Sequence, residues 1–145
     1  QHVPETHLIP LMLDAIAGKR PALTVFGSDY PTPDGTCVRD YVHVSDLVDA
    51  HVLGLKWLLD GKGSEVFCLG SGNGFSVREV IAQSRVVTNR DVPIVEGERR
   101  PGDAAKLVSG SVKALEALGW QPKRSDLRQM IGDAWRWHQT GSYDY

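Results

Sequence analysis

The local pattern changes twice, from turn to strand and from strand to helix, within the stretch Asp34-Gly-Thr-Cys-Val-Arg-Asp-Tyr-Val-His-Val-Ser-Asp-Leu47. Its first two residues are typical of a turn, and residues 37–44 are predicted to be extended. Asp46 and Asp49 indicate a helix start, and the apolar residues that follow keep helical spacing as far as Gly61. A turn, a strand and a helix in direct succession predict an α/β arrangement.

Further helices and strands are predicted on both sides of this stretch. Thr6 is expected to cap a helix that stops at Gly18. Ser76 and Glu79 have the spacing of a capping box for a helix that begins near Val77. The other expected elements are strands over 23–26, 66–69 and 93–95, and helices over 111–118 and 125–138. So few short strands predict an α/β chain without a complete doubly wound sheet.

Composition excludes several classes of function. The 145 residues are 41% hydrophobic and 23% charged, which suits one globular domain with a core. A net charge of −2 gives no broad field for nucleic acid or an anionic membrane, so neither is expected as a partner. No apolar run approaches the roughly 20 residues of a membrane span. Two cysteines, Cys37 and Cys68, are expected as buried thiols, and the chain as cytoplasmic.

A glycine-rich segment, Gly70-Ser-Gly-Asn-Gly74, lies between a predicted strand and a predicted helix. That order resembles a dinucleotide-binding fingerprint. The fingerprint places its third glycine three positions after the second, where this chain has Phe75. Because a phenylalanine would obstruct the packing of helix on strand, the segment is predicted to be a structural turn.

The search for catalytic residues is negative. No tyrosine is followed by a lysine four residues later, and no Gly-x-Ser-x-Gly motif is present. The five histidines have no metal-ligand spacing with cysteine or carboxylate. His43 lies in an apolar extended segment and is expected to be a hydrogen-bonded core residue. The chain is therefore predicted to hold no catalytic residue and no metal site.

Two segments that set an arginine near an aspartate are candidates for an anion site. Arg39 precedes Asp40, and Arg100 lies in Glu98-Arg-Arg-Pro-Gly-Asp103. A guanidinium presents two parallel donors to phosphate oxygens, and a carboxylate accepts from ribose hydroxyls. Two surface ion pairs, Arg39 with Asp40 and Arg100 with Asp103, explain the same spacing at about 0–1 kcal/mol each. Spacing alone does not decide between these interpretations.

Residues 34–47 closely resemble the DGT-x-x-RDY-I/V-HV-x-DL signature of UDP-glucose 4-epimerases, which are extended short-chain dehydrogenase/reductases. Further resemblances follow in the same order at residues 7–10, 25–35, 70–77, 99–103 and 135–137. The resemblance corresponds to the carboxy-terminal part of a family member. It implies the substrate-binding region of a Rossmann-type NAD(P)-binding enzyme, with a UDP-sugar-binding domain over 1–140 that includes parts of the sheet edge. The last residues, 141–145, are expected to form a flexible tail.

The resemblance also implies the residues of a substrate site. Arg39 and Arg100 are expected to bind the UDP diphosphate, and Asp103 a ribose hydroxyl, with Tyr41 in the neighbouring pocket. Thr24, Val25 and Phe26 match the strand that meets the uracil. Leu8 and Val77 match apolar positions of the pocket.

Two positions depart from the pattern that many members share. His7 stands where asparagine is usual, and its expected role is either donation to a phosphate or merely the first turn of a helix. Leu107 stands where a large tyrosine lies beside the sugar's 2-position. A smaller side chain leaves more room, so N-acetylated UDP-sugars are expected to be tolerated.

The activity implied is interconversion of UDP-glucose and UDP-galactose through a 4-keto intermediate, with NAD taking and returning the hydride. The family's NAD-binding turn and its Tyr-x-x-x-Lys pair have no counterpart here. NAD is therefore expected in an absent N-terminal domain, and the chain alone is expected to be inactive. The alternatives are another nucleotide-sugar epimerase or dehydratase of the extended family, and a non-catalytic nucleotide-sugar-binding fragment. A homodimer is expected at full length, whereas this chain is expected to expose apolar surface and to self-associate or be marginally stable.

Overall fold

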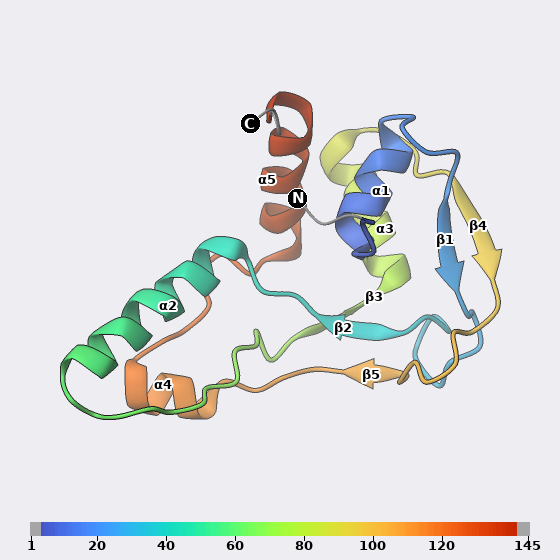
Figure 1. Cartoon of the computed structure of the whole chain (residues 1–145). Coiled ribbons are helices and arrows are strands. Elements are labelled where there is room, and N and C mark those ends of the chain that lie inside the picture. The colour runs from blue at the N-terminus through green and yellow to red at the C-terminus, as the bar shows by residue number, and fades with distance from the viewer. Residues whose placement is uncertain (1–3, 142–145) are drawn as a thin grey trace.

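The computed structural model describes residues 4–141, which form five helices and five short strands. In chain order these are α1 Leu8–Ile16, β1 Leu23–Phe26, β2 Val38–Asp40, α2 Val44–Leu59, β3 Gly74–Ser76, α3 Val77–Thr88, β4 Ile94–Gly97, β5 Lys106–Leu107, α4 Val112–Leu118 and α5 Leu127–Thr140. Figure 1 shows α1, α3 and α5 grouped together, β1 and β4 beside them at one edge, and α2 and α4 extending at the opposite side. The predicted α/β class with few short strands is confirmed.

The strands form two small sheets. β1 pairs with β4 in parallel, in a register that sets Leu23 opposite Ile94. The second sheet has the order β3-β2-β5, with β3 antiparallel and β5 parallel to the central strand β2. Arg39 pairs with Phe75 on one side and with Leu107 on the other. Because registered neighbours project to the same face of a sheet, these three side chains form one row.

The main hydrophobic core lies between α1, α3, α5 and β1. Its most completely buried side chains are Met12, Leu13, Leu23, Val25, Val80 and Ile131. A smaller cluster joins α2 to α4 through Ala50, Ala114 and Trp120, whose indole nitrogen donates to the Asp46 carbonyl at 2.8 Å. Burial of each large apolar side chain contributes about 1.5–3 kcal/mol. Two clusters at two ends explain the elongated outline in Figure 1.

The capping box predicted for α3 is confirmed. The Ser76 hydroxyl accepts from the Glu79 backbone N–H at 3.0 Å, and the Glu79 carboxylate accepts from the Ser76 N–H at 2.7 Å. At α1, however, the predicted cap by Thr6 is wrong, because His7 occupies the N-cap position and makes no side-chain cap bond. Instead, the Glu5 carboxylate accepts from the backbone N–H groups of Thr6 and His7, both at 2.8 Å.

One predicted strand is wrong and two strands were not predicted. Residues 66–69 pair with no other strand within 4–141, and Val66 is 77% exposed. Phe67 and Leu69 pack on the α2–α4 cluster instead. β3 and β5 exist because both pair with β2, and such long-range pairing leaves little local signal.

Two helix boundaries also differ from the prediction. α2 begins at Val44 rather than Asp46, because His43 accepts from the Ser45 N–H at 3.0 Å and so serves as the cap. α5 begins at Leu127 rather than at residue 125, with Asp126 as its N-cap. The tail expected over 141–145 lies outside the described residues beyond Gly141.

The outer face of α2 is apolar and exposed. Its aliphatic side chains are 47–77% exposed, and we call them the α2 stripe: Val44, Val48, Val52, Leu55 and Leu59. Their spacing places them on one side of the helix, opposite the side that carries Ala50. A helix that is apolar on two sides has one face without a partner within residues 4–141.

Both cysteines in residues 4–141 are free, as predicted. Cys37 is buried, but Cys68 is exposed, so the expectation of two buried thiols is wrong for Cys68. Cys68 lies in the unpaired segment 66–69, which explains its exposure. No helix within the described residues has the length and apolar character needed to cross a bilayer.

Candidate functional site

The backbone of the glycine-rich turn, residues 70–74, is hydrogen-bonded to the Asp40 carboxylate of the same chain. Asp40, the last residue of β2, accepts from the backbone N–H groups of Ser71 at 3.1 Å, Gly72 at 3.3 Å and Ser109 at 3.2 Å. A Cβ on Gly70 would lie 2.2 Å from the Ser109 carbonyl oxygen. The structure therefore agrees with the prediction of a structural turn, whose N–H groups already have an anionic partner.

The two predicted arginine sites meet at one carboxylate. Arg39 donates through Nη2 to Asp103 Oδ1 at 3.2 Å, and Arg100 Nε lies 3.6 Å from Asp103 Oδ2. Arg39 also donates through Nη1 to the carbonyls of Val38 and Ala104, at 2.9 and 2.8 Å. Of the two ion pairs in the alternative interpretation, Arg100–Asp103 is present, whereas Arg39 pairs with Asp103 instead of Asp40, which the glycine turn uses.

A cleft of about 270 Å³ lies beside Arg100. Four predicted site residues line it, namely Leu8, Thr24, Phe26 and Arg100. Glu5 and Arg20 line it as well, although no sequence pattern indicated either of them. The Arg100 guanidinium lies 4.2 Å from the centroid of the Phe26 ring, a cation–π contact. Aromatic, aliphatic and cationic groups thus share one wall.

Successive side chains of strand β1 point to opposite faces, one buried and one toward the cleft. Leu23 and Val25 are buried at 2% and 1% exposure, whereas Thr24 and Phe26 lie on the other face. The backbone N–H groups of Leu23 and Gly27 donate to the neighbouring chain segment at Pro93 and Gly97. The peptide N–H groups of Thr24 and Phe26 therefore point to the opposite edge of the strand. The Val25 side chain belongs to the core and does not line the cleft.

The other predicted residues lie outside the cleft wall. Leu107 is 56% exposed and registers beside Arg39, while Val77 packs against the main core. Tyr41 lines a separate groove of about 470 Å³ with His43 and other residues. Burial raises the pKa of Tyr41 to about 12, so its phenol stays protonated at neutral pH. His7 is 68% exposed and lies between the lining residues Thr6 and Leu8.

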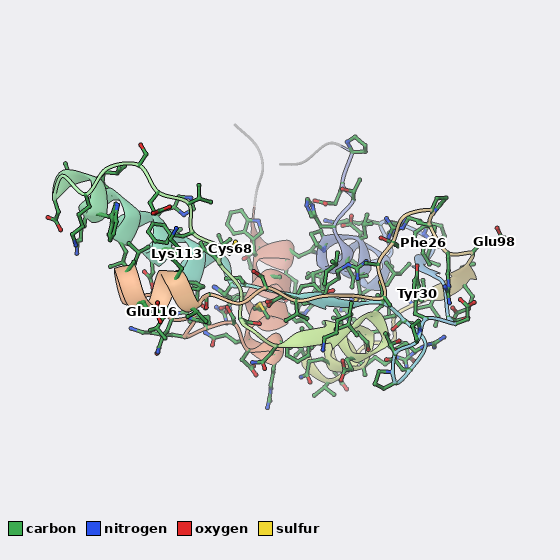
Figure 2. All side chains as sticks on the ribbon, turned by 90° about the horizontal axis from the view of Figure 1, so that it is seen from below. Phe26, Tyr30, Cys68, Glu98, Lys113 and Glu116 are labelled. Carbon is green, nitrogen blue, oxygen red and sulfur yellow. The ribbon has the colours of Figure 1, made fainter. Side chains whose placement is uncertain are left out.

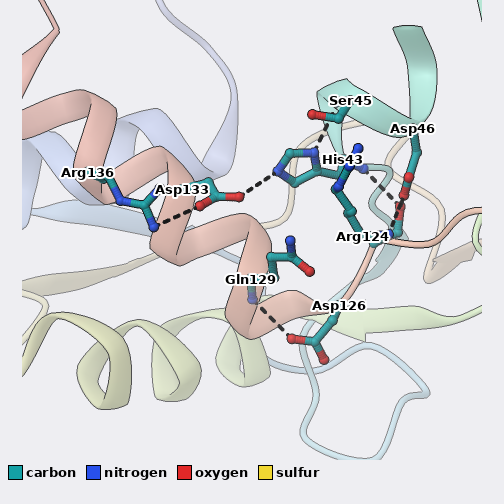
Figure 3. Close-up of polar contacts among 9 residues, drawn as sticks. His43, Ser45, Asp46, Arg124, Asp126, Gln129, Asp133 and Arg136 are labelled. Carbon is teal, nitrogen blue, oxygen red and sulfur yellow. Dashed lines mark hydrogen bonds and ion pairs between the residues drawn. The ribbon is translucent and has the colours of Figure 1, made fainter. Parts of the chain in front are cut away.

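His43 is a hydrogen-bonded core residue, as predicted. It is 8% exposed; its Nδ1 accepts from the Ser45 N–H, and its Nε2 lies 3.1 Å from Asp133 Oδ2 on α5 (Figure 3). Because a neutral imidazole carries one proton and one lone pair, Nε2 donates to Asp133 and both nitrogens have partners. Asp133 also pairs with Arg136 at 3.1 Å. This network joins the start of α2 to α5.

A second ion pair orders the loop after β1. Arg99 donates through Nε to Asp29 Oδ1 at 2.6 Å, and its guanidinium lies 4.3 Å from the centroid of the Tyr30 ring. Gly27 has φ +78°, and a Cβ there would meet Tyr30 at 2.6 Å. No role was predicted for Arg99 from the sequence. It holds the loop after β1 next to Arg100, the residue that pairs with Asp103. Within residues 4–141, no cluster of three or more metal-ligating side chains occurs.

Another hollow lies far from these residues. It has about 530 Å³ and lies between α2 and α4, where Leu55, Trp57 and Phe67 line it. Figure 2 shows Phe26 at the opposite end of the molecule from Cys68 and Lys113, which mark the α2–α4 end. None of the predicted site residues lines this hollow. The cleft at Phe26 is therefore the candidate site, because charge and aromatic surface converge there.

Comparison with known proteins supports the resemblance to UDP-glucose 4-epimerases. The profile of the NAD dependent epimerase/dehydratase family matches residues 1–70. A UDP-glucose 4-epimerase of Lacticaseibacillus casei is 49% identical over 139 residues, which are 96% of this chain and 42% of that relative. The chain is a homologue of UDP-glucose 4-epimerases. It spans less than half the length of the curated relatives that it matches.

Solved structures place this epimerase homologue in the same fold. A crystal structure of a UDP-glucose 4-epimerase is 52% identical, with a TM-score of 0.94 over 100% of the homologue and 44% of that chain. The enzyme of Stenotrophomonas maltophila, with bound NAD and formylated UDP-arabinopyranose, is 42% identical with a TM-score of 0.90. That match covers 96% of the homologue and 41% of the solved chain. The α/β arrangement of the homologue is thus part of the epimerase fold.

Proposed function

We propose that the homologue forms the UDP-sugar-binding part of an NAD-dependent UDP-glucose 4-epimerase, with residues 1–140 as the carboxy-terminal binding domain. The observation that carries the proposal is the position of Asp103 between Arg39 and Arg100, at 3.2 and 3.6 Å, next to the cleft. Two guanidinium groups with one carboxylate leave one net positive charge. That balance suits a diphosphate with an adjoining sugar diol.

Each end of the nucleotide has a matching part of the site. Arg39 and Arg100 bind the diphosphate, and Asp103 accepts from the ribose. Phe26 and Thr24 meet the uracil with a ring face and with peptide groups at the strand edge. Leu8 supplies apolar surface. Val25, Val77 and Tyr41 support this wall from the core and the adjoining groove.

NAD supplies the hydride acceptor of the reaction when it is bound. The glycine-rich turn does not fit the pyrophosphate of NAD, because its N–H groups already bind Asp40. We therefore place NAD and the reacting groups in polypeptide outside these 145 residues. This chain holds the nucleotide, and binding energy far from the reacting carbon orients the sugar.

The size of Leu107 bears on which sugars are accepted. Its side chain is 56% exposed and registers beside Arg39, so it borders the space next to the diphosphate ligand. We propose that UDP-N-acetylglucosamine binds about as well as UDP-glucose. Leu107→Tyr should weaken the N-acetylated ligand and spare UDP-glucose. Equal weakening of both ligands would contradict this assignment.

Calorimetric titration of the chain with UDP-glucose tests the binding function. Arg39→Ala and Arg100→Ala should each weaken binding about 10- to 100-fold, the effect of losing charge-assisted hydrogen bonds. Arg85→Ala, which removes an exposed arginine paired with Asp91, is the matched control and should leave the affinity unchanged. Absence of binding by the wild-type chain would contradict the proposal. With NAD added, the chain alone should not convert UDP-galactose.

A further inference from the structure

Two consecutive arginines in the loop after β4 contact different residues at and just after the end of β1. The Arg100 guanidinium lies 4.2 Å from the centroid of the Phe26 ring, and both residues line the cleft. The Arg99 guanidinium lies 4.3 Å from the centroid of the Tyr30 ring and donates through Nε to Asp29 Oδ1 at 2.6 Å. Figure 2 shows Phe26 and Tyr30 at the same end of the molecule. The proposed ligand arginine therefore follows directly after a residue that is tied to another segment.

The Arg99 side chain is held along its whole length. A Cβ on Gly27 would lie 2.7 Å from Arg99 Cγ and 2.6 Å from the Tyr30 ring, so the arginine stem packs closely against the backbone there. Arg99 Nη2 also donates to the Asp29 carbonyl. Tyr30 is 6% exposed, so its ring gives the guanidinium a fixed surface. The stem, the donors and the π contact together fix the position of Arg99.

The Arg100 side chain has weaker contacts of its own. It is 59% exposed, and its Nε lies 3.6 Å from Asp103 Oδ2, which is longer than a hydrogen bond. The backbone around Arg100 is better fixed. The Asp103 N–H donates to the Arg100 carbonyl at 3.2 Å, and earlier in the loop the Gly97 carbonyl accepts from the Gly27 N–H at 2.9 Å. Because Arg99 lies between these two backbone contacts, its side chain anchors the peptide from which Arg100 projects.

We propose that Arg99 is a positioning residue that holds Arg100 where its guanidinium binds the diphosphate of the nucleotide sugar. The inference rests on the nucleotide-sugar binding proposed above and adds a residue that acts on the ligand only through its neighbour. A side chain whose backbone is fixed before the ligand arrives loses less freedom on binding, which raises the affinity.

Two rival explanations predict different results. In the first, Arg99 contributes only its positive charge to the anion site. In the second, the pair of Arg99 with Asp29 only stabilises the folded chain. The two side chains are 44% and 76% exposed, and an exposed ion pair contributes little to overall stability.

Variants of Asp29 separate positioning from charge. Asp29→Ala removes a negative charge, so a pure charge effect strengthens anion binding, whereas loss of the Arg99 anchor weakens it. In calorimetric titration with UDP-glucose, Asp29→Ala and Arg99→Ala should both bind about three- to tenfold more weakly than wild type, the effect of ordering one long side chain. Asp29→Asn keeps an acceptor oxygen for Arg99 Nε and should restore most of the affinity. Unchanged or tighter binding by Asp29→Ala would overturn the proposal.

Combination with Arg100→Ala shows whether Arg99 acts through its neighbour. In that background Arg99→Ala should weaken UDP-glucose binding no further, because no guanidinium remains for it to position. An additional loss there would mean that Arg99 acts on the ligand directly, and it would overturn the proposal. Arg78→Ala is the matched control, because it removes a similarly exposed arginine that pairs with Glu96 of β4 at 2.7 Å. It should leave the affinity unchanged.

Urea unfolding excludes the purely stabilising role. Arg99→Ala and Asp29→Ala should unfold at nearly the same urea concentration as wild type, since their ion pair is exposed. A large fall in that concentration, together with weaker binding, would overturn the proposal. Wild-type binding that Arg99→Ala leaves unchanged would overturn the inference while leaving the proposed function intact. No binding of UDP-glucose by the wild-type chain would overturn both.

Discussion

The Arg39 guanidinium donates to the Asp103 carboxylate at 3.2 Å, although 64 residues of sequence separate them. The contact forms because β2 and β5 run in parallel and bring the loop before β5 to the side of Arg39. Asp103 also holds Arg100, whose guanidinium lies over Phe26. The Asp103 carboxylate therefore joins β2, the loop before β5 and the wall of the cleft.

Asp103→Asn should weaken UDP-glucose binding about tenfold. The amide keeps the shape of the side chain but loses the charge that orients both arginines and accepts from a ribose hydroxyl. Calorimetry measures the change. Asp91→Asn removes a 96% exposed carboxylate near an arginine and should leave the affinity unchanged. Equal affinity of the Asp103 variant and wild type would refute the role of Asp103.

Gly70→Ala should lower the free energy of unfolding by about 2–3 kcal/mol. The new methyl would lie 2.2 Å from the Ser109 carbonyl oxygen and 2.8 Å from an Asp40 carboxylate oxygen, so the turn has to open. Urea unfolding measures the loss. Gly54→Ala is the matched control, because nothing lies within 4 Å and alanine favours the interior of α2 by about 0.5–1 kcal/mol.

Stability should fall in acid through Asp34. Partial burial opposes ionisation of this carboxyl, but hydrogen bonds from Ser76 and Thr36 outweigh it and lower the pKa of Asp34. A lowered folded-state pKa gives stability that is present above the unfolded-state pKa and is lost as the pH falls through the folded value. The loss should therefore begin below about pH 4.

Asp34→Asn should make unfolding less dependent on acid and cost about 1.5–3 kcal/mol at pH 7. Urea unfolding at several pH values measures both effects. Asp60→Asn changes an exposed carboxylate at the end of α2 and is the control. If the two variants showed the same acid profile, Asp34 would not be the group responsible.

Asp133→Ala should destabilise the chain by about 1–3 kcal/mol. It leaves the buried Nε2–H of His43 without its acceptor and breaks the link between α2 and α5. Arg136→Ala removes the exposed partner of the same carboxylate and should cost under about 1 kcal/mol. Thermal unfolding compares them, and a larger loss for the Arg136 variant would contradict this division.

The α2 stripe should make the chain self-associate as its concentration rises. Five aliphatic side chains that are 47–77% exposed on one helix face form an apolar patch in contact with water. Val48→Lys with Leu55→Glu should shift the sedimentation coefficient toward that of a monomer. Lys56→Glu, on another side of α2, should not. A wild-type chain that stays monomeric at high concentration would argue against this prediction.

Local patterns determined much of this protein. Ser76 with Glu79 fixed the start of α3, and the apolar spacing of Leu127, Met130 and Ile131 identified the buried face of α5. The short strand at Leu23–Phe26 was equally visible. These features depend on neighbours within a few residues, so their signals lie in consecutive sequence.

Tertiary structure decided which strands pair and which charged side chains meet. β3 and β5 exist only through pairing with β2, and the run at 66–69 forms no strand because no strand within residues 4–141 lies beside it. Sequence proximity suggested Asp40 as the partner of Arg39, but the glycine turn takes Asp40 and Arg39 turns to Asp103. Hydrogen bonds between distant segments depend on where the packed core places those segments. The sequence alone therefore identified the arginines of the candidate site, and only the fold showed that they share one carboxylate.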